Sequence, residues 1–258
     1  MSDTKAPSAR RRGMRWILRA AITFGLLVAG LAGYFVWTVS NAKKQTSALM
    51  AAALADAASR GSSLTVEDLG EERESLLLAI EDPMFRRHHG VDFATPGAGW
   101  TTITQGLVKL LYFPEGFKAG FPKIRQTLIA QHALDALVSK DQQLTLYLNI
   151  TYFGNVDGKA VRGFSDAART YFHKEFAELS RQEFISLIAM TIGPNSLKPG
   201  TAANDERIQR IENYLSGVYV PKDVMDVEYN GEVPNDGVAG RTLLGFLKLV
   251  TKDCPEEW

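Results

Sequence analysis

The sequence predicts a mainly α-helical domain behind one N-terminal transmembrane helix. Three observations support this architecture: residues 20–39 carry no formal charge, apolar residues beyond residue 65 recur at helical spacing, and few runs alternate with the period of two typical of strands. We expect five segments: a basic cytoplasmic tail (1–19), a transmembrane anchor (20–39), a juxtamembrane stalk (40–63), a globular domain (64–217) and a C-terminal extension (218–258).

The charges that flank residues 20–39 predict the orientation of the anchor. Six Lys and Arg residues and one Asp precede the segment, whereas only Lys43 and Lys44 follow it closely. Because basic residues favour the cytoplasmic side, we expect a single pass through the cytoplasmic membrane, with residues 45–258 in the periplasm or outside the cell. A cleaved signal peptide is the alternative, since 40–42 loosely fits a cleavage site, but so long an apolar run favours an anchor.

The overall charge excludes one class of partner. The chain of 258 residues has 29 basic and 29 acidic side chains, and the part beyond residue 39 has 23 basic and 28 acidic ones. That part therefore has a net charge of −5. Electrostatic binding of nucleic acid depends on net basic surface, so we expect no nucleic-acid partner.

Local sequence signals predict the helices of the domain. A Ser or Thr followed three residues later by an acid or an amide is typical of a helix start, where the two side chains cap free backbone N–H groups. Apolar residues three and four positions apart predict the helix that follows. We expect helices beginning at Thr65, over 124–138, over 139–148, over 180–190 and around 208–215, then an irregular stretch over 218–238 and a last amphipathic helix over 241–251.

Glu81 and Asp82 follow the apolar run 76–80 directly. A carboxyl group at the buried end of a helix can have a raised pKa and serve as a general base. Taken alone, an acidic pair at a helix end is more often a solvated surface feature. The residues that follow favour the catalytic interpretation.

Phe85 lies three residues after Asp82, and His88, Gly90 and Asp92 come next. Three further groups follow in order: Thr101-Thr102-Ile103-Thr104-Gln105 with Leu107 and Lys109; Ser139-Lys140-Asp141 with Tyr147-Leu148-Asn149 and Tyr152-Phe153-Gly154; and Gly163, Ala167-Ala168 and Tyr171-Phe172 with Lys174. These groups resemble the first, second, fourth and fifth motifs of the family 51 glycosyltransferases. That family comprises the peptidoglycan-polymerising transglycosylases, found alone or as the head of penicillin-binding proteins. The resemblance covers roughly residues 70–200.

The resemblance implies a lysozyme-like transglycosylase domain whose substrate is lipid II, a disaccharide-pentapeptide on undecaprenyl pyrophosphate. In the implied reaction a carboxylate takes the proton from the 4-hydroxyl of the acceptor sugar, which attacks the anomeric carbon of the donor. Lipid pyrophosphate leaves, and cations neutralise its developing charge. Glu81 matches the family's base, with Asp82 as a further catalytic candidate. The expected substrate-binding residues are His88, Thr102, Gln105, Lys109, Lys123 and Arg125, with Lys109 the first choice for a phosphate contact.

No cofactor or protein-bound metal is expected, because the four His residues lack compact metal-ligand spacing. A divalent cation that bridges the pyrophosphate of the substrate stays open. The expected partners are lipid II, the nascent glycan and the cytoplasmic membrane, and other cell-wall synthesis proteins stay open.

The sequence departs from the family at its second glutamate. Counting back from Ser139 places Thr127 at that position, with Gln126 beside it, and neither residue carries a charge. Trp100 also stands where the second motif usually has a Gly, which would crowd the approach of a pyrophosphate.

Two functions therefore stay open. One is a polymerising enzyme that works with Glu81 alone or with a repositioned acid such as Asp82 or Asp135. The other is a catalytically weak or inactive paralogue that binds lipid II, glycan or cell-wall synthesis partners. A third function, glycan cleavage with Glu81 as the acid, needs a second carboxylate that the sequence does not place.

Three aromatic residues predict a membrane-proximal apolar patch. Phe113, Phe117 and Phe121 are spaced four apart, so a helix would put all three on one face, suited to dipping into lipid. Gly116 and Gly120 weaken the expectation of a helix, and core packing is the alternative.

Overall fold

Helices make up most of the structure, as the sequence predicts. The structure is a computed structural model that describes residues 9–117, 120–234 and 237–251. Its elements are α1 (Ala9–Ser59), α2 (Val66–Glu81), α3 (Ile103–Tyr112), α4 (Phe121–Ile129), the π-helix η1 (Ala130–Leu134), α5 (Asp135–Leu137), α6 (Lys140–Ile150), β1 (Tyr152–Val156), β2 (Lys159–Arg162), α7 (Phe164–Phe172), the 3-10 helix η2 (Phe176–Glu178), α8 (Arg181–Met190), α9 (Ala202–Leu215) and α10 (Gly237–Val250).

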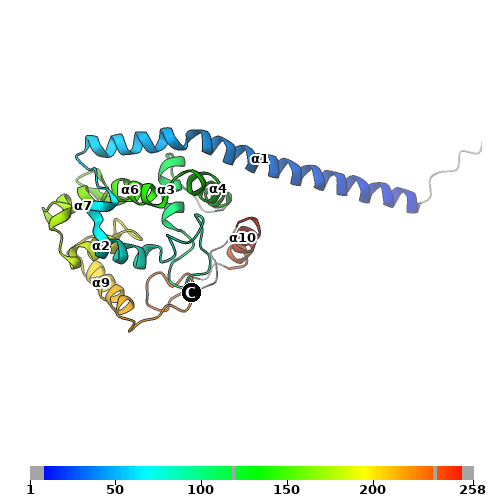
Figure 1. The fold of residues 1–258 in the computed structure, drawn as a ribbon. Coiled ribbons are helices and arrows are strands. Elements are labelled where there is room, and N and C mark those ends of the chain that lie inside the picture. The colour runs from blue at the N-terminus through cyan, green and yellow to red at the C-terminus, as the bar shows by residue number, and fades with distance from the viewer. Residues whose placement is uncertain (1–8, 118–119, 235–236, 252–258) are drawn as a thin grey trace, which may run out of the picture.

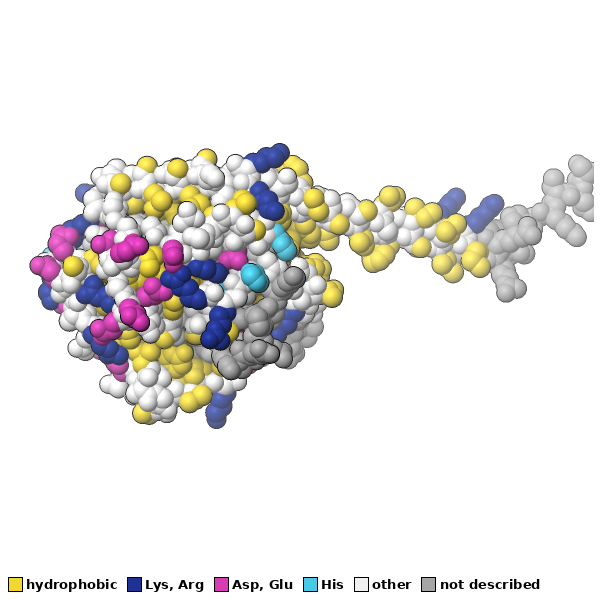
Figure 2. Space-filling model, viewed as in Figure 1, with side chains coloured by type: hydrophobic (Ala, Val, Ile, Leu, Met, Phe, Trp, Pro, Cys, Tyr) yellow, Lys and Arg dark blue, Asp and Glu magenta, His cyan; other side chains and the backbone are white. Residues whose placement is uncertain are grey.

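Helix α1 joins the predicted anchor and the predicted stalk in one element of 51 residues. Its N-terminal half projects from the domain as a mostly hydrophobic arm, and its C-terminal half lies across the domain (Figures 1 and 2). Over Met14–Ser59 it is the one helix in the described part of the chain that is long and apolar enough to span a membrane.

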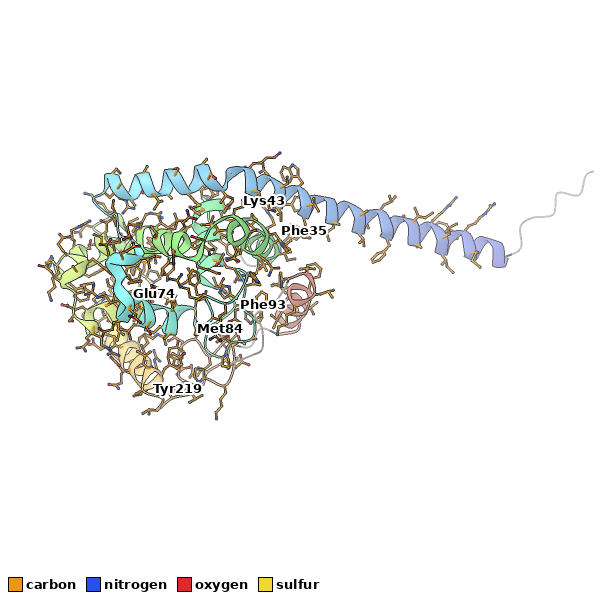
Figure 3. All side chains as sticks on the ribbon, viewed as in Figure 1. Phe35, Lys43, Glu74, Met84, Phe93 and Tyr219 are labelled. Carbon is orange, nitrogen blue, oxygen red and sulfur yellow. The ribbon has the colours of Figure 1, made fainter. Side chains whose placement is uncertain are left out.

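The segment 40–63 differs from the expectation of a stalk, because it packs as part of the domain. Ala42, Thr46 and Ala57 are buried, and their small side chains let the helix approach its neighbours closely. The Thr46 hydroxyl also shares a hydrogen bond of 2.7 Å with the Tyr112 hydroxyl of α3. In Figure 3, Phe35 and Lys43 mark the place where α1 leaves the domain.

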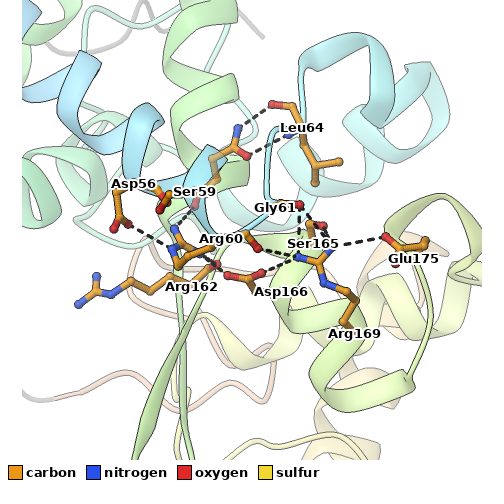
Figure 4. Close-up of polar contacts among 11 residues, drawn as sticks. Asp56, Ser59, Arg60, Gly61, Leu64, Arg162, Ser165, Asp166, Arg169 and Glu175 are labelled. Carbon is orange, nitrogen blue, oxygen red and sulfur yellow. Dashed lines mark hydrogen bonds and ion pairs between the residues drawn. The ribbon is translucent and has the colours of Figure 1, made fainter.

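Polar contacts fasten the C-terminal end of α1 to the rest of the domain (Figure 4). Arg60 forms an ion pair with Asp166 of α7 and donates a hydrogen bond of 2.7 Å to the Arg162 carbonyl of β2. The side chain of Asn149, at the end of α6, accepts from the Leu64 N–H at 2.9 Å and donates to the Leu64 carbonyl at 2.6 Å. The turn between α1 and α2 is therefore held from two sides.

The predicted helix starts are confirmed. Thr65, Ser139 and Ser180 are the N-caps of α2, α6 and α8, and each forms a capping box with the side chain three residues later. The irregular stretch and the last helix are also confirmed, since the chain has no helix or strand between α9 and α10 in its described residues. Residues 235–236 and 252–258 of the extension lie outside the described residues.

A two-stranded antiparallel hairpin, which the sequence analysis did not predict, separates α6 from α7. Strands β1 and β2 pair Tyr152 with Arg162 and Val156 with Lys159. The turn between them is Asp157-Gly158, and both residues have positive φ angles, 50° and 76°. Such a turn suits the right-handed twist of the two strands.

The core is built around large apolar side chains. Phe153, Phe164 and Phe184 are fully buried, with ring centroids 4.8 Å apart for the first pair and 5.7 Å for the second. The helix predicted over 124–138 is present, but as α4, η1 and α5 in succession, with a π-helical turn in the middle. A π-helical turn is a local irregularity often found beside functional sites.

The helical arrangement expected for Phe113, Phe117 and Phe121 is wrong. Helix α3 ends at Tyr112 and α4 begins at Phe121, so at least the described part of the connection is a loop. Phe113 and Phe117 contact each other edge to face at 5.3 Å and are half-buried. Phe121 is 47% exposed, and its ring stacks on Phe35 of α1 at 5.6 Å. The exposed aromatic ring thus adjoins the apolar helix, although the three rings do not share one helical face.

The chain after α9 returns to the loop that precedes α3. Tyr219, just beyond α9, lies at the edge of the domain opposite α1 (Figure 3). A few residues further on, the chain meets the loop before α3. The N–H groups of Gly97 and Gly99 in that loop donate to the carbonyls of Asp223 and Val224, at 2.9 and 2.8 Å. The C-terminal extension is therefore part of the wall around this loop.

Candidate active site

Glu81 is the last residue of α2, and two hydroxyl groups hold its side chain. The Tyr147 hydroxyl of α6 donates to one carboxylate oxygen at 2.7 Å. The Thr191 hydroxyl, directly after α8, donates to the other at 2.6 Å. Three separate segments therefore fix the position of one carboxyl group.

Burial raises the pKa of the Glu81 carboxyl above its ordinary value. The hydrogen bonds from Thr191 and Tyr147 and the positive charge of Arg207 oppose this effect but do not cancel it. A carboxyl group with a raised pKa is a stronger base once ionised, and general bases are most effective when their pKa lies near the working pH. The surroundings of Glu81 thus favour proton abstraction.

Glu81 lies on the wall of a cavity of about 420 Å³. Among the described residues that line it, Glu81 is the one acid and Lys109 the one cation. The other lining residues are Thr101, Thr102, Ile103, Gly106, Leu110, Tyr147, Thr151, Tyr152, Thr191, Ile192 and Pro194. Of the residues predicted for the site, the structure brings Glu81, Thr102 and Lys109 together here.

Two lysines lie close to this cavity. Burial lowers the pKa of the Lys109 ammonium group. Burial and the charge of Lys109 together lower the pKa of Lys123 to about 7. The Lys123 ammonium donates to the Trp100 carbonyl at 2.6 Å and to the Thr101 hydroxyl at 3.1 Å. Lys123 therefore supports the loop 100–101 and is not itself among the residues that line the cavity, so its expected substrate contact stays a prediction.

Asp82 and His88 form a buried pair that also differs from the expected roles. Both side chains are 1% exposed, and neither lines the cavity. The Gly90 N–H donates to His88 Nδ1, so Nε2 carries the proton and donates to the Asp82 carboxylate at 3.0 Å. Asp82 also accepts from the Ile103 N–H at the start of α3, at 2.9 Å. The pair connects the end of α2 to α3 and positions the segment that carries Glu81.

The second motif and the position of the missing glutamate meet in another buried network. Thr102 caps α3 and donates to the Gly90 carbonyl at 2.8 Å. Gln105 is fully buried, and its side-chain amide donates to the Thr127 hydroxyl at 3.0 Å. Thr127, also fully buried, donates to the Lys123 carbonyl at 2.8 Å. Neither Gln105 nor Thr127 lines the cavity, so Gln105 differs from the expected substrate contact.

Arg125 and Asp135 lie away from the cavity wall. The Arg125 guanidinium lies 5.3 Å from the centre of the Phe113 ring. Asp135 forms an ion pair of 2.7 Å with Lys140 and accepts from the Gln143 side chain at 3.0 Å. The structure therefore brings neither residue to Glu81, and Asp135 does not replace the missing glutamate.

Three residues that act on Glu81 were not predicted as part of the site. Tyr147 was identified only as part of a matched motif, and Thr191 and Arg207 were not singled out. The sequence gives no direct signal for Thr191, which lies 110 positions from Glu81. Tyr147 belongs to a matched motif and was the one that could have been found.

The described residues show no group of three or more His, Cys, Asp or Glu side chains arranged to hold a metal ion. A divalent cation that bridges the pyrophosphate of the substrate would bind chiefly to phosphate oxygens. The arrangement of the protein's own side chains therefore does not test whether such a cation binds. That expectation stays a prediction.

Comparison with known proteins places these features in a family. The family model described as Transglycosylase matches residues 46–218. The chain is 28% identical to penicillin-binding protein 2a of Streptococcus pneumoniae over 176 residues, which is 64% of this chain and 23% of that protein. It is 32% identical to penicillin-binding protein 1B of Buchnera aphidicola (50% of this chain, 18% of that protein) and 30% identical to penicillin-binding protein 1F of Bacillus subtilis (53% and 20%).

The chain thus spans about a fifth of the length of these curated relatives. The match begins at residue 46, inside α1, in agreement with the packing of that helix on the domain. The predicted fold class, a mainly α, lysozyme-like transglycosylase domain behind one apolar N-terminal helix, is confirmed. Since the match covers well over half of the chain and includes Glu81 and its cavity, the chain belongs to the transglycosylase family, glycosyltransferase family 51.

Proposed function

We propose that the protein polymerises lipid II into glycan strands and releases undecaprenyl pyrophosphate. The observation that carries this proposal is the carboxyl group of Glu81, held by two hydroxyl groups and facing a cavity that also contains Lys109. The transglycosylase family and the penicillin-binding relatives support the same activity.

In the proposed reaction, ionised Glu81 takes the proton from the 4-hydroxyl of the acceptor sugar. The hydroxyl oxygen then forms a bond to the anomeric carbon of the donor, and the bond from that carbon to the pyrophosphate oxygen breaks. Lys109 supplies positive charge where the pyrophosphate becomes more negative. Tyr147 and Thr191 keep the carboxylate aimed at the hydroxyl group. A divalent cation on the pyrophosphate would assist the same charge neutralisation.

The apolar arm of α1 supports a location at the cytoplasmic membrane, which suits a lipid-linked substrate. We propose that the N-terminus lies inside and the domain outside, because six basic residues precede the apolar segment and two follow it. A C-terminal reporter that is active only in the cytoplasm should be silent. An active reporter would contradict the proposed orientation.

A polymerisation assay on purified protein tests the activity. Glu81→Gln keeps the shape of the side chain but removes the base, so we expect glycan formation from lipid II to fall by ~10²–10⁴-fold. Glu72→Gln is the matched control, because Glu72 lies on the same helix and is exposed. Equal activity of the wild type and Glu81→Gln would refute the assignment of the base.

One observation favours a second candidate, a catalytically weak or inactive paralogue that binds lipid II, glycan or cell-wall synthesis partners. Glu81 is the one acid among the described residues of the cavity, and Thr127 is buried against Gln105. A glutamate at position 127 reaches the cavity only by displacing the buried contact with Gln105; if it does so and one carboxylate limits the rate, Thr127→Glu should increase polymerisation. An inactive wild type and an equally inactive Thr127→Glu, both of which still bind lipid II, would support the paralogue.

A further inference from the structure

A second cavity of about 210 Å³ lies beside the first. It is bounded by the loop 97–101, by Arg207 of α9 and by Met225 and Val227 of the C-terminal extension. Glu81 lines both cavities, as do Thr101 and Ile192. We call this space the side cavity. Liquid water occupies about 30 Å³ per molecule, so the volume corresponds to roughly seven waters, enough for a small polar group.

Arg207 is the feature of the side cavity that folding alone does not explain. Its side chain is 2% exposed, yet its Nε and Nη1 atoms have no hydrogen-bond partner among the described residues. Its guanidinium lies 4.6 Å from the centre of the Tyr229 ring. Glu228 of the extension pairs with Arg210 at 3.2 Å. A buried charge without an ion pair or full hydrogen bonding is costly, and a bound anion would offset that cost.

The extension holds the opposite wall of the side cavity firmly. The backbone bonds from Gly97 and Gly99 tie the loop to residues 223 and 224. A Cβ atom at Gly97 would lie 2.8 Å from the Pro221 ring, so the two segments approach as closely as a glycine permits. The Tyr229 hydroxyl donates to the Ile80 carbonyl at 3.0 Å, directly before Glu81. The side cavity is thus preformed and does not need a bound ligand to shape it.

We propose that the side cavity binds an oxyanion carried by the substrate, a carboxylate or a phosphate, and that Arg207 is its ligand. The guanidinium carries N–H groups without a partner at Nε and Nη1, and each can donate to an oxygen of such a group. The apolar side chains of Met225 and Val227 exclude water and so strengthen the contact. Because Glu81 lines both cavities, an anion bound here would hold the substrate beside the base. That the anion belongs to the substrate rests on the proposed function; binding of the anion does not.

This site is separate from the contact proposed for the leaving pyrophosphate. Lys109 lines the first cavity and not the side cavity, whereas Arg207 lines only the side cavity. Substitution of one cation should therefore leave anion binding at the other intact. The proposed anion site also gives residues 220–229 a role, which neither the motifs nor the family match over residues 46–218 assigns.

Thermal unfolding in the presence of simple anions tests the proposal without the reaction. We would titrate the full-length protein with inorganic phosphate and, separately, with acetate, against chloride at equal ionic strength. A ligand that binds only the folded state raises the melting temperature. We expect at least one oxyanion to raise the melting temperature of the Lys109→Met protein. The same oxyanion should not raise the melting temperature of the Arg207→Met protein. The anion that gives this Arg207-dependent rise identifies the site as one for phosphate or for carboxylate.

Two further variants separate binding from folding. Met225→Trp fills the side cavity and leaves Arg207 in place, so the oxyanion should no longer give this variant the Arg207-dependent rise in melting temperature. If Arg207→Met does not fold, Met225→Trp decides whether the oxyanion binds in the side cavity. Arg181→Met is the matched control, because Arg181 is exposed on α8 and pairs with Glu212. It should respond to the anions as the wild type does. Two results would overturn the proposal. One is an Arg207→Met or Met225→Trp protein whose melting temperature rises with the oxyanion as much as that of Lys109→Met. The other is a Lys109→Met protein whose melting temperature does not rise with either oxyanion.

Kinetics with lipid II then link the site to the substrate. Arg207→Met removes a charge-assisted hydrogen bond that would form equally in the ground state and in the transition state. Its removal should raise KM by about ten- to a hundredfold and leave kcat nearly unchanged. If the protein makes no polymer but binds anions through Arg207, the proposed function fails and the anion site stands. If it makes polymer and Arg207→Met matches the wild type in anion binding and KM, the anion site alone fails.

Discussion

The contact between Tyr147 and Glu81 predicts how the rate depends on pH. Tyr147→Phe removes the hydroxyl that donates to the carboxylate at 2.7 Å and leaves the buried ring in place. Such a bond favours the ionised form, so its loss should raise the pKa of Glu81 further. The acid side of the pH profile of kcat/KM should therefore move to higher pH.

The size of this effect follows from the kind of bond that is removed. A hydrogen bond to a charged group contributes ~1.5–3 kcal/mol, and one to the neutral acid contributes ~0.5–1.5 kcal/mol. The difference of about 1–1.5 kcal/mol shifts the protonation equilibrium of Glu81 roughly five- to thirteenfold toward the acid. Above the new pKa the base is fully ionised, so Tyr147→Phe should nearly match the wild type on the alkaline plateau.

The assay is the initial rate of glycan formation from lipid II between pH 5 and pH 9. Tyr171→Phe is the control, because that hydroxyl donates to the Phe153 carbonyl at 2.7 Å and does not contact Glu81. The acid limb of this control should coincide with that of the wild type. A Tyr147→Phe profile that stays in place, moves to lower pH or falls equally at all pH values would refute the argument, since each result means that the hydroxyl does not control ionisation of the base.

Three further predictions concern buried charges. The pKa of Glu81 is raised in the folded protein above 4.5, the ordinary value that applies in the unfolded chain. Between these two pKa values the folded protein holds a proton that the unfolded chain has released. The free energy of unfolding therefore falls as the pH rises from 4.5 through the folded pKa. Calorimetry should show that Glu81→Gln raises the melting temperature most above that pKa and least near pH 4, and a pH-independent difference would argue against this. Lys123 should titrate at about pH 7 by NMR of its side chain, and Lys109→Met should raise the midpoint by removing a neighbouring charge; a midpoint near 10.5 would contradict the burial argument. Asp82→Ala leaves two buried donors unpaired, at ~1–3 kcal/mol each, so urea unfolding should show a loss of about 2–6 kcal/mol; a loss well below 1 kcal/mol would show that the pair is not structural.

The helix starts were predictable because their signals are local. Thr65, Ser139 and Ser180 are bonded to residues only three positions away, so the sequence contains both partners. The hairpin was missed although Asp157-Gly158 is a strong turn signal. Its strands have five and four residues, too short for an alternation of apolar and polar residues to stand out.

The site was predictable only in part, because a motif shows which residues recur and not where their side chains point. Glu81 and Lys109 line the cavity, whereas His88 and Gln105 from the same motifs are buried in the scaffold. The Thr191 contact depends on how α2 and α8 pack together, which no local pattern encodes. Residues that position a base are therefore harder to find from sequence than the base itself.

On the proposed membrane location, the unbroken course of α1 would limit how high the domain can stand above the bilayer. Only two residues separate Val39, the end of the apolar segment, from Ala42, which is buried in the domain; from Val39 to Ala42 the helix rises by about 5 Å. The apolar segment and the segment packed on the domain belong to one continuous helix, so their relative direction and distance are set by helix geometry. One inserted residue near position 40 would turn the membrane arm by about 100° relative to the domain, whereas seven would nearly restore its direction while raising the domain by about 10 Å. On the proposed function, a substrate whose lipid chain stays in the membrane would then meet the cavity at a different direction or height from that in the uninserted protein.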